Sequence, residues 1–364
     1  MERVEKLCNR LSAFKQVSRP VNLSHAFRCL ATDVVTHFAF PEPRSTLDAP
    51  DFAKSMSETL RIYSAVITWQ RHIKIAFPIL LNLPEWLTEW MDPTGAAKGQ
   101  NEDQKALFRQ ASTAVQRQGR VPEGVTPSLL DTLASAPELS GHDKRVQRIH
   151  EEGQNVVGAG TETTGATLSC LFFYVLANPS IYERLKNEVR GYITRSSSAL
   201  LDFRALERLP YLQACISEAL RIASPVSGRL PRVNPRAEMT YTSPSGKTYT
   251  FPKGTVLSMG MRDLHFDPTV FPKPHTFDPD RWLIPDQEGL KAMRSRLVPF
   301  SSGSRGCLGK ELAVQELTLT VGNLFSKFDF DLAEGVSERD VGFAHDWFAP
   351  YAEGDCEGVR VLVH

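Results

Sequence analysis

The longest helix predicted by this sequence has no polar side over its second half, and this limits the folds open to the chain. The pattern begins near Asp143 and ends at Asn178-Pro179. Its second half is apolar all round, through Leu168, Cys170, Leu171, Phe172, Phe173, Val175 and Leu176. A helix of this kind belongs in the middle of a large core. A chain of 364 residues can supply that core as one large domain or two ordinary ones.

Helical periodicity dominates the first part of the chain, about 1–222, and short strand patterns appear in the remainder, about 223–364. Thr240–Thr242 and Lys247–Thr250 flank Ser243-Pro-Ser-Gly246, which predicts a hairpin. Residues 358–363 predict a final strand, and residues 345–352 before it predict a loop into a substrate cavity. The fold class expected is therefore mainly α with small β-sheets.

Charge, cysteine spacing and apolar run length argue against a nucleic-acid partner, a disulfide framework and a transmembrane helix. The formal net charge is zero, so overall charge suggests no nucleic-acid partner. The six cysteines are scattered without paired spacing, which indicates a reducing compartment rather than a disulfide framework. The chain has no apolar run of about 18 residues, the length that a transmembrane helix needs.

One cysteine stands at the end of a glycine-rich stretch, Phe300-Ser-Ser-Gly303-Ser-Arg305-Gly-Cys307-Leu-Gly309, and helix-forming sequence follows it directly. The N-terminus of a helix favours an anion such as a thiolate, the form of cysteine that binds metals. The glycines let a flat ligand approach the backbone, and Arg305 offers a cation to an acidic group of that ligand. A lone cysteine fits an axial haem ligand better than zinc, which needs three or four protein ligands. The alternative is a structural cysteine after a turn.

Polar residues and glycines interrupt the long helix at Gly158-Ala159-Gly160-Thr161-Glu162-Thr163-Thr164. Each glycine costs about 1 kcal/mol relative to alanine in a helix, and such a breach of local preference often marks a functional site. Thr163 follows Ala159 by four residues, so its hydroxyl can bond the Ala159 carbonyl and open the helix locally. The alternative is that the glycines serve close helix packing.

Two further features carry charged or aromatic side chains. Glu218 and Arg221 lie three residues apart in an otherwise apolar helix and can pair. The stretch 67–91 contains Trp69, Trp86 and Trp90, which would suit either packing or contact with a membrane surface.

The cysteine stretch matches F-x-x-G-x-R-x-C-x-G, and in this it resembles the haem-binding signature of the cytochrome P-450 family. Ala159–Thr163 resembles the family's oxygen-activating motif, and Glu218-x-x-Arg221 resembles its E-x-x-R. The resemblance implies one P-450 domain over 1–364.

The resemblance also implies that Cys307 is the axial ligand of a haem b iron, within a loop formed by Phe300, Gly303 and Gly309. It assigns proton delivery to Glu162 and Thr163, and it assigns binding of the haem propionates to Arg305 and Arg232. His265 is the weaker propionate candidate, because a lone histidine is usually structural. Arg281 is expected to complete a structural network with Glu218 and Arg221.

The same resemblance implies a haem-thiolate monooxygenase that inserts one oxygen atom from dioxygen into a small lipophilic substrate. It looks most like fungal microsomal enzymes of terpenoid or polyketide biosynthesis. Such enzymes take electrons from NADPH through a reductase at the cytosolic face of the endoplasmic reticulum membrane.

The sequence departs from the family pattern at its start. An anchor, the first strands and helices, and a W-x-x-x-R helix are expected but do not occur; Trp69 is followed four places later by Ile73. The chain is therefore expected to be truncated at its N-terminus. A haem-binding fragment without monooxygenase activity is the alternative function. A haem-thiolate isomerase or dehydratase is a third, against which the Glu162-Thr163 pair argues.

Overall fold

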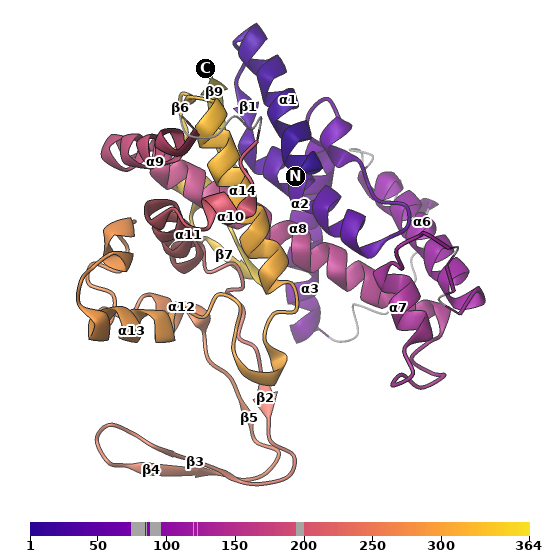
Figure 1. Ribbon diagram of the computed structural model, residues 1–364. Helices are drawn as coiled ribbons and strands as arrows, with labels where there is room; N and C mark the ends of the chain where they lie inside the picture. Colours follow the sequence, from indigo (N-terminus) through magenta and orange to yellow (C-terminus); the bar gives the residue numbers. More distant parts are fainter. Residues whose placement is uncertain (74–83, 85, 88–95, 119, 122, 194–199) are drawn as a thin grey trace.

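The computed structural model describes residues 1–73, 84, 86–87, 96–118, 120–121, 123–193 and 200–364. Within them, helices far outweigh strands (Figure 1). The helices are α1 (Glu2–Val17), α2 (Leu23–Ala39), α3 (Lys54–His72), α6 (Ala96–Gln116), α7 (Leu129–Ser135), α8 (Val146–Leu176), α9 (Pro179–Ile193), α10 (Phe203–Leu206), α11 (Pro210–Ala223), α12 (Met261–His265), α13 (Gln287–Arg296) and α14 (Lys310–Lys327). The expected fold class, mainly α with small sheets, is confirmed.

The strands are short and pair antiparallel. They are β1 (Val21–Asn22), β2 (Arg232–Val233), β3 (Met239–Thr242), β4 (Thr248–Phe251), β5 (Val256–Leu257), β6 (Phe330–Leu332), β7 (His345–Trp347), β8 (Ala349–Tyr351) and β9 (Arg360–Val363). One three-stranded sheet has the order β1-β9-β6, and β2-β5, β3-β4 and β7-β8 are two-stranded. The hairpin expected around Ser243–Gly246 is β3-β4, and it projects from the body of the molecule (Figure 1).

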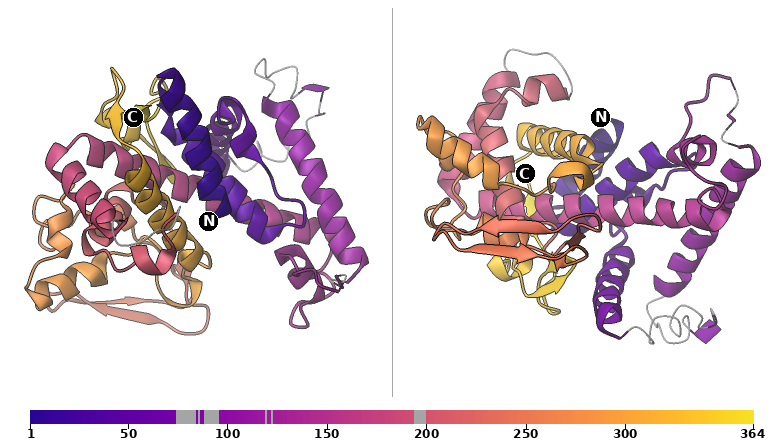
Figure 2. Two further views of the ribbon diagram at one scale, coloured as in Figure 1. Left: turned by 45° about the horizontal axis from the view of Figure 1, so that its top comes forward. Right: turned by 90° about the horizontal axis from the view of Figure 1, so that it is seen from below.

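Helix α8 is the centre of the core. In Figure 2 it extends across most of the molecule, with α6 and α7 near one end. Its apolar half contributes fully buried side chains, among them Leu168, Leu171 and Phe172. Phe172 stacks on Phe325 of α14 with ring centroids 4.9 Å apart. The prediction that this helix lies inside a large core is therefore confirmed.

Local sequence explains where the principal helices begin. The Asn22 side chain accepts a hydrogen bond from the His25 backbone nitrogen at 3.1 Å and so caps α2. Ser128 and Asp131 form a reciprocal capping box at the start of α7. Pro210 occupies the first turn of α11, where its missing N–H costs nothing.

Several expectations need correction. The long helix begins at Val146 rather than near Asp143, because the residues before it form turns. Residues 345–351 form the β7-β8 hairpin rather than an open loop, because they pair in register. Much of the stretch 67–91 lies outside the described residues; within it, Trp69 and Trp86 are exposed.

Candidate functional site

The loop that carries Cys307 is a tight turn held by its own backbone. The Cys307 nitrogen donates a hydrogen bond to the Phe300 carbonyl at 2.8 Å, and the Gly306 nitrogen donates to the Gly303 carbonyl at 3.0 Å. Gly303 has φ +76°, a left-handed conformation that favours glycine. Phe300 is half-buried against the main core and anchors the loop. The loop therefore presents the Cys307 thiol at the start of α14, and that residue is exposed.

The surface around the thiol suits a flat apolar ligand. Leu308, next to Cys307, is 94% exposed. A Cβ added at Gly309 would meet no atom of the chain within 4 Å, so the fold itself does not require glycine there. Among the described residues no cluster of three or more His, Cys, Asp or Glu could hold a metal ion. A single thiolate beside the open Gly309 and the exposed Leu308 fits the haem group.

Two arginines predicted to bind propionates are both exposed. Arg305 lies in the turn before Cys307, and Arg232 lies on β2, where its Nη1 donates to the Pro231 carbonyl at 3.0 Å. The loop before α14 and the β2-β5 pair occupy the same lower side of the molecule in Figure 1. A guanidinium group can bind a carboxylate through two parallel N–H donors. Exposed arginines therefore suit the carboxylates of the haem propionates.

Thr163 makes the hydrogen bond expected of it. Its hydroxyl donates to the Ala159 carbonyl at 2.8 Å. The expected opening of the helix does not follow, because α8 stays α-helical from Val146 to Leu176. Gly158 and Ala159 are exposed and Thr163 is half-buried, so this side of α8 faces a space that the chain does not fill.

Glu162 lies on a different side of α8 from Thr163. Its carboxylate accepts two hydrogen bonds from Arg28 of α2, at 2.8 Å from Nε and 2.6 Å from Nη2. Both side chains are largely buried, with 9% of Glu162 and 15% of Arg28 exposed. Burial disfavours the charged form of Arg28, but the carboxylate outweighs it and raises the pKa of Arg28. Arg28 was not predicted as a site residue, although a cation between Phe27 and Cys29 of an apolar helix is a signal of a buried charge.

The glycines of this region also serve helix packing. A Cβ at Gly160 would lie 2.8 Å from Cγ2 of Val35, and one at Gly165 would lie 3.2 Å from Cα of Arg28. Both glycines therefore allow α2 to approach α8 closely. The packing alternative holds for Gly160 and Gly165, while Gly158 lies on the open side.

Glu218, Arg221 and Arg281 meet in the core. The Glu218 carboxylate accepts hydrogen bonds from Arg221, at 2.7 and 3.0 Å, and from Arg281 at 3.1 Å. Trp282, which was not predicted from the sequence, donates its indole N–H to the same carboxylate at 2.9 Å. Arg221 also donates to the carbonyls of His265 and Pro274. The cluster therefore joins α11 to the segment that leads to the cysteine loop.

His265 has a structural environment rather than one open to a ligand. It is fully buried, and its Nε2 accepts a hydrogen bond from the Val298 nitrogen at 2.9 Å. Its Nδ1 lies 3.0 Å from the Ser224 hydroxyl. Burial lowers the pKa of His265 to about 4, and a neutral ring suits an accepting nitrogen.

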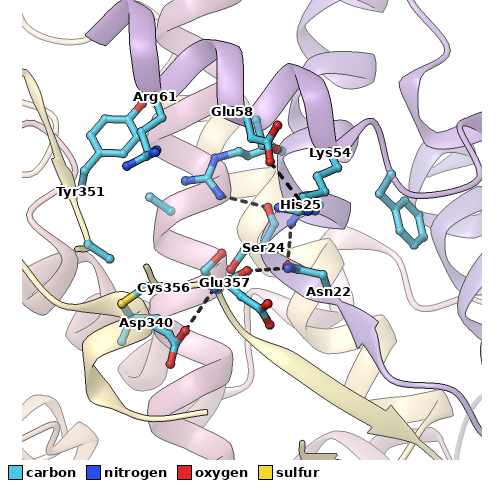
Figure 3. A pocket seen from close by; sticks show the side chains of 18 of the residues that line it. Asn22, Ser24, His25, Lys54, Glu58, Arg61, Asp340, Tyr351, Cys356 and Glu357 are labelled. Atoms are coloured by element: carbon cyan, nitrogen blue, oxygen red, sulfur yellow. Dashed lines mark hydrogen bonds and ion pairs between the residues drawn. The ribbon is translucent and has the colours of Figure 1, made fainter. Parts of the chain in front are cut away.

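A cavity of about 700 Å³ lies between α2, α3 and the loops of residues 340–358 (Figure 3). Arg28 and Tyr351 line it, and Cys307 and Thr163 do not. This cavity therefore borders the ion pair of Glu162 and is separate from the open side of α8.

The sequence as a whole matches a known family model. The model described as Cytochrome P450 matches residues 1–344. The chain belongs to the cytochrome P450 family. It is 33% identical to cytochrome P450 monooxygenase MO6277 of Ascocoryne sarcoides, over 99% of this chain and 70% of that protein. It is also 33% identical to N-acetyltryptophan 6-hydroxylase ivoC of Emericella nidulans, over 98% of this chain and 68% of that protein.

Family membership establishes the chemistry in outline. This P450 is a monooxygenase of fungal type whose family uses a haem iron, dioxygen and electrons from a redox partner. A third relative, cytochrome P450 monooxygenase claJ of Penicillium crustosum, is 31% identical over 99% of this chain and 80% of its own length. In the described part of the chain no single helix has both the length and the apolar character of a membrane span; α8 and α9 together, bent by 109°, meet those two criteria.

Proposed function

We propose that Cys307 is the thiolate ligand of a haem b iron. The observation that carries the proposal is the exposed thiol of Cys307, presented by a glycine turn at the start of α14. Phe300, Gly303 and Gly309 shape the loop, and Arg305 and Arg232 bind the propionates. When bound, the haem supplies the activation of dioxygen, and a thiolate ligand favours cleavage of the O–O bond.

The roles of the chain's own residues follow from their positions. Thr163 holds a proton at its hydroxyl on the open side of α8, where the Ala159 carbonyl fixes the direction of that hydroxyl. Glu162 is the acid through which protons reach this turn, and Arg28 holds its carboxylate with two hydrogen bonds. Glu218, Arg221 and Arg281 fix the backbone before the cysteine loop. The apolar residues of α8 exclude water from the core beneath the site.

The partners proposed are an NADPH-dependent reductase, a small lipophilic substrate of fungal secondary metabolism, and the cytosolic face of the endoplasmic reticulum membrane. The support for them is similarity to named fungal monooxygenases. The exposed Trp69 and Trp86 suit a membrane surface.

The test is the carbon monoxide difference spectrum of the reduced, haem-loaded chain. Cys307→Ser should abolish the strongly red-shifted Soret band, because a serine hydroxyl does not replace the thiolate donor. Cys356→Ser is the matched control, since Cys356 is the other cysteine that is not buried. A red-shifted band that survives in Cys307→Ser would show that the ligand is a different residue.

A further inference from the structure

The cavity between α2, α3 and the loops of residues 340–358 has the size of a small-molecule site. Its volume of about 700 Å³ lies within the range of roughly 300–1,000 Å³ that is usual for ligand pockets. One face of α3 lines it with residues that recur every three or four positions: Lys54, Ser57, Glu58 and Arg61. In Figure 3 the loop that carries Cys356 lies across the space from this face. Cys307 and Thr163 are outside the lining, so a molecule held here would not occupy the haem side.

Arg61 is a half-buried cation of this lining. Its guanidinium points into the space between α3 and the loop of Cys356 (Figure 3). Its Nη1 would lie 3.3 Å from a Cβ added at Gly354, so the side chain extends toward that loop. No carboxylate in the described part of the chain pairs with it. A guanidinium carries five N–H donors, and half-buried donors normally have acceptors.

The other cations of the lining are differently placed. Arg28 is bound in the ion pair with the α8 carboxylate described above. Lys54 lies 3.8 Å from the carboxylate of Glu58, one turn along α3. Arg19 is exposed and therefore well solvated. Arg61 thus combines partial burial with the lack of a counter-charge.

The acids of the lining are mostly occupied or exposed, so they compete little for that guanidinium. Three of them lie near cations outside the cavity, namely Asp355 with Arg339 at 3.2 Å, Glu357 with Arg360 at 2.7 Å and Glu353 with His345 at 3.6 Å. Asp340 accepts hydrogen bonds from the backbone nitrogens of Ser337 and Gly358. Asp51 is exposed. A paired carboxylate repels an anion less than a free one does, because its charge is partly neutralised.

Apolar side chains form much of the remaining wall. Phe14 and Phe52 both line the cavity and stack with ring centroids 5.8 Å apart. Val21, Val341 and Pro350 add aliphatic surface. An apolar wall with a small number of polar groups that fix orientation is the usual design of a ligand pocket. Here the wall suits an aromatic body, and the guanidinium suits a carboxylate.

We propose that this cavity is a binding site, separate from the haem side, for a small organic carboxylate with an aromatic body. Arg61 binds the carboxylate through two parallel N–H donors, and the apolar wall holds the body. The proposal does not depend on the roles proposed for Cys307, Glu162 and Thr163.

The first test is calorimetric titration of the haem-loaded chain with naphthoate and with naphthamide, which has nearly the same shape and no charge. Naphthoate should show one saturable site and should bind about tenfold or more tightly than naphthamide. Arg61→Gln should weaken naphthoate about tenfold and leave naphthamide unchanged, while Arg61→Lys should keep part of the affinity. Arg236→Gln, at an exposed arginine between β2 and β3, is the matched control and should change neither.

The Soret band of the same samples locates the probe, because a ligand at the haem side shifts it and one in this cavity does not. Naphthoate that binds Arg61→Gln as tightly as the native chain would overturn the proposal. So would a Soret shift that follows occupancy, or no saturable binding below about 1 mM.

The second test uses thermal unfolding, which does not need the haem and so stays separate from the proposed function. Naphthoate should raise the unfolding midpoint of the native chain, because a ligand that binds the folded state stabilises it. It should raise the midpoint of Arg61→Gln much less, although that variant without ligand should unfold at nearly the native temperature. Equal shifts in the two proteins would show that Arg61 does not bind the carboxylate.

Discussion

At the scale of single residues, the carboxylate of Glu218 shows how one side chain can hold a large segment. It is fully buried and accepts from Arg221, Arg281, Trp282 and the Asp278 nitrogen. It forms ion pairs with the guanidinium groups of Arg221 and Arg281, which are themselves almost completely buried. A buried ion cluster of this kind contributes little net stability relative to apolar packing, but the removal of one member is costly.

Glu218→Gln should therefore lower the free energy of unfolding by about 3–5 kcal/mol, because it leaves two buried cations without a counter-charge. Urea unfolding followed by circular dichroism measures the loss. Glu183→Gln is a suitable comparison, since its pair with Lys186 lies at the surface and should contribute under about 1 kcal/mol. Equal effects of the two substitutions would contradict the structural role of the cluster.

Thr163→Ala is expected to separate proton delivery from haem binding. The variant should keep its haem content and its electron uptake, while more electrons leave as peroxide and fewer as product. Thr163→Ser is the conservative variant and should restore coupling, because it keeps the hydroxyl. Peroxide release and product formation are measured per NADPH consumed, and unchanged coupling in the alanine variant would remove Thr163 from the relay.

The sequence predicted the pairing of Glu218 with Arg221 but not that of Glu162 with Arg28. The distance between the partners along the chain explains the difference. Glu218 and Arg221 share one helical turn, so their pairing follows from helix geometry. Glu162 and Arg28 are 134 residues apart, and only the packing of α2 on α8 brings them together. The partnership of Glu162 was therefore invisible in the sequence, and its side chain lies away from Thr163.

At the scale of elements, the helices, the β3-β4 hairpin and the final strand β9 were largely predictable, and the two-residue strands were not. A helix repeats its apolar residues over several turns, whereas β1, β2 and β5 have two residues each and carry no period. Helix α8 combines two roles that the sequence pattern could not separate. On one side, Gly160 and Gly165 carry no side chain and so let α2 pack closely. On the open side, Gly158 carries none.

A pair of alanine substitutions in α8 distinguishes these two sides. Gly165→Ala places a Cβ against Cα of Arg28, so it should destabilise the fold by about 1–3 kcal/mol. Gly158→Ala meets no atom of the chain and should stabilise the helix by about 0.5–1 kcal/mol. Urea unfolding of the haem-free chain measures both effects. Effects of the same sign would show that α2 and α8 are not packed as described.

At the scale of the whole molecule, two buried titratable groups limit stability at opposite ends of the pH range. Burial lowers the pKa of His265 from 6.5 to about 4, so its contribution is complete above pH 6.5 and is lost as the pH falls toward 4. Burial raises the pKa of Glu316, on α14, from 4.5 to about 8, so its contribution is complete below pH 4.5 and is lost as the pH rises toward 8. The two slopes oppose each other between pH 4.5 and 6.5.

Glu316→Gln should therefore flatten the alkaline side of the stability curve. Between pH 5.5 and 8 the native chain should lose up to roughly 3 kcal/mol of unfolding free energy through this group, and the variant should lose much less. The measurement is urea unfolding at both pH values for the two proteins. Parallel curves for them would mean that Glu316 does not carry this dependence.

The β1-β9-β6 sheet joins strands that lie far apart in the sequence, so it can form only late in synthesis. Val21 pairs with Val361, and Asn22 donates from its side chain to the Glu357 carbonyl, 335 positions later. Contacts of such high sequence separation form slowly, because a long loop must close before they contribute. During synthesis, β1 emerges from the ribosome long before its partner strand exists. Strand β1 therefore cannot pair until β9 has been synthesised, and chaperones have that whole interval in which to bind it.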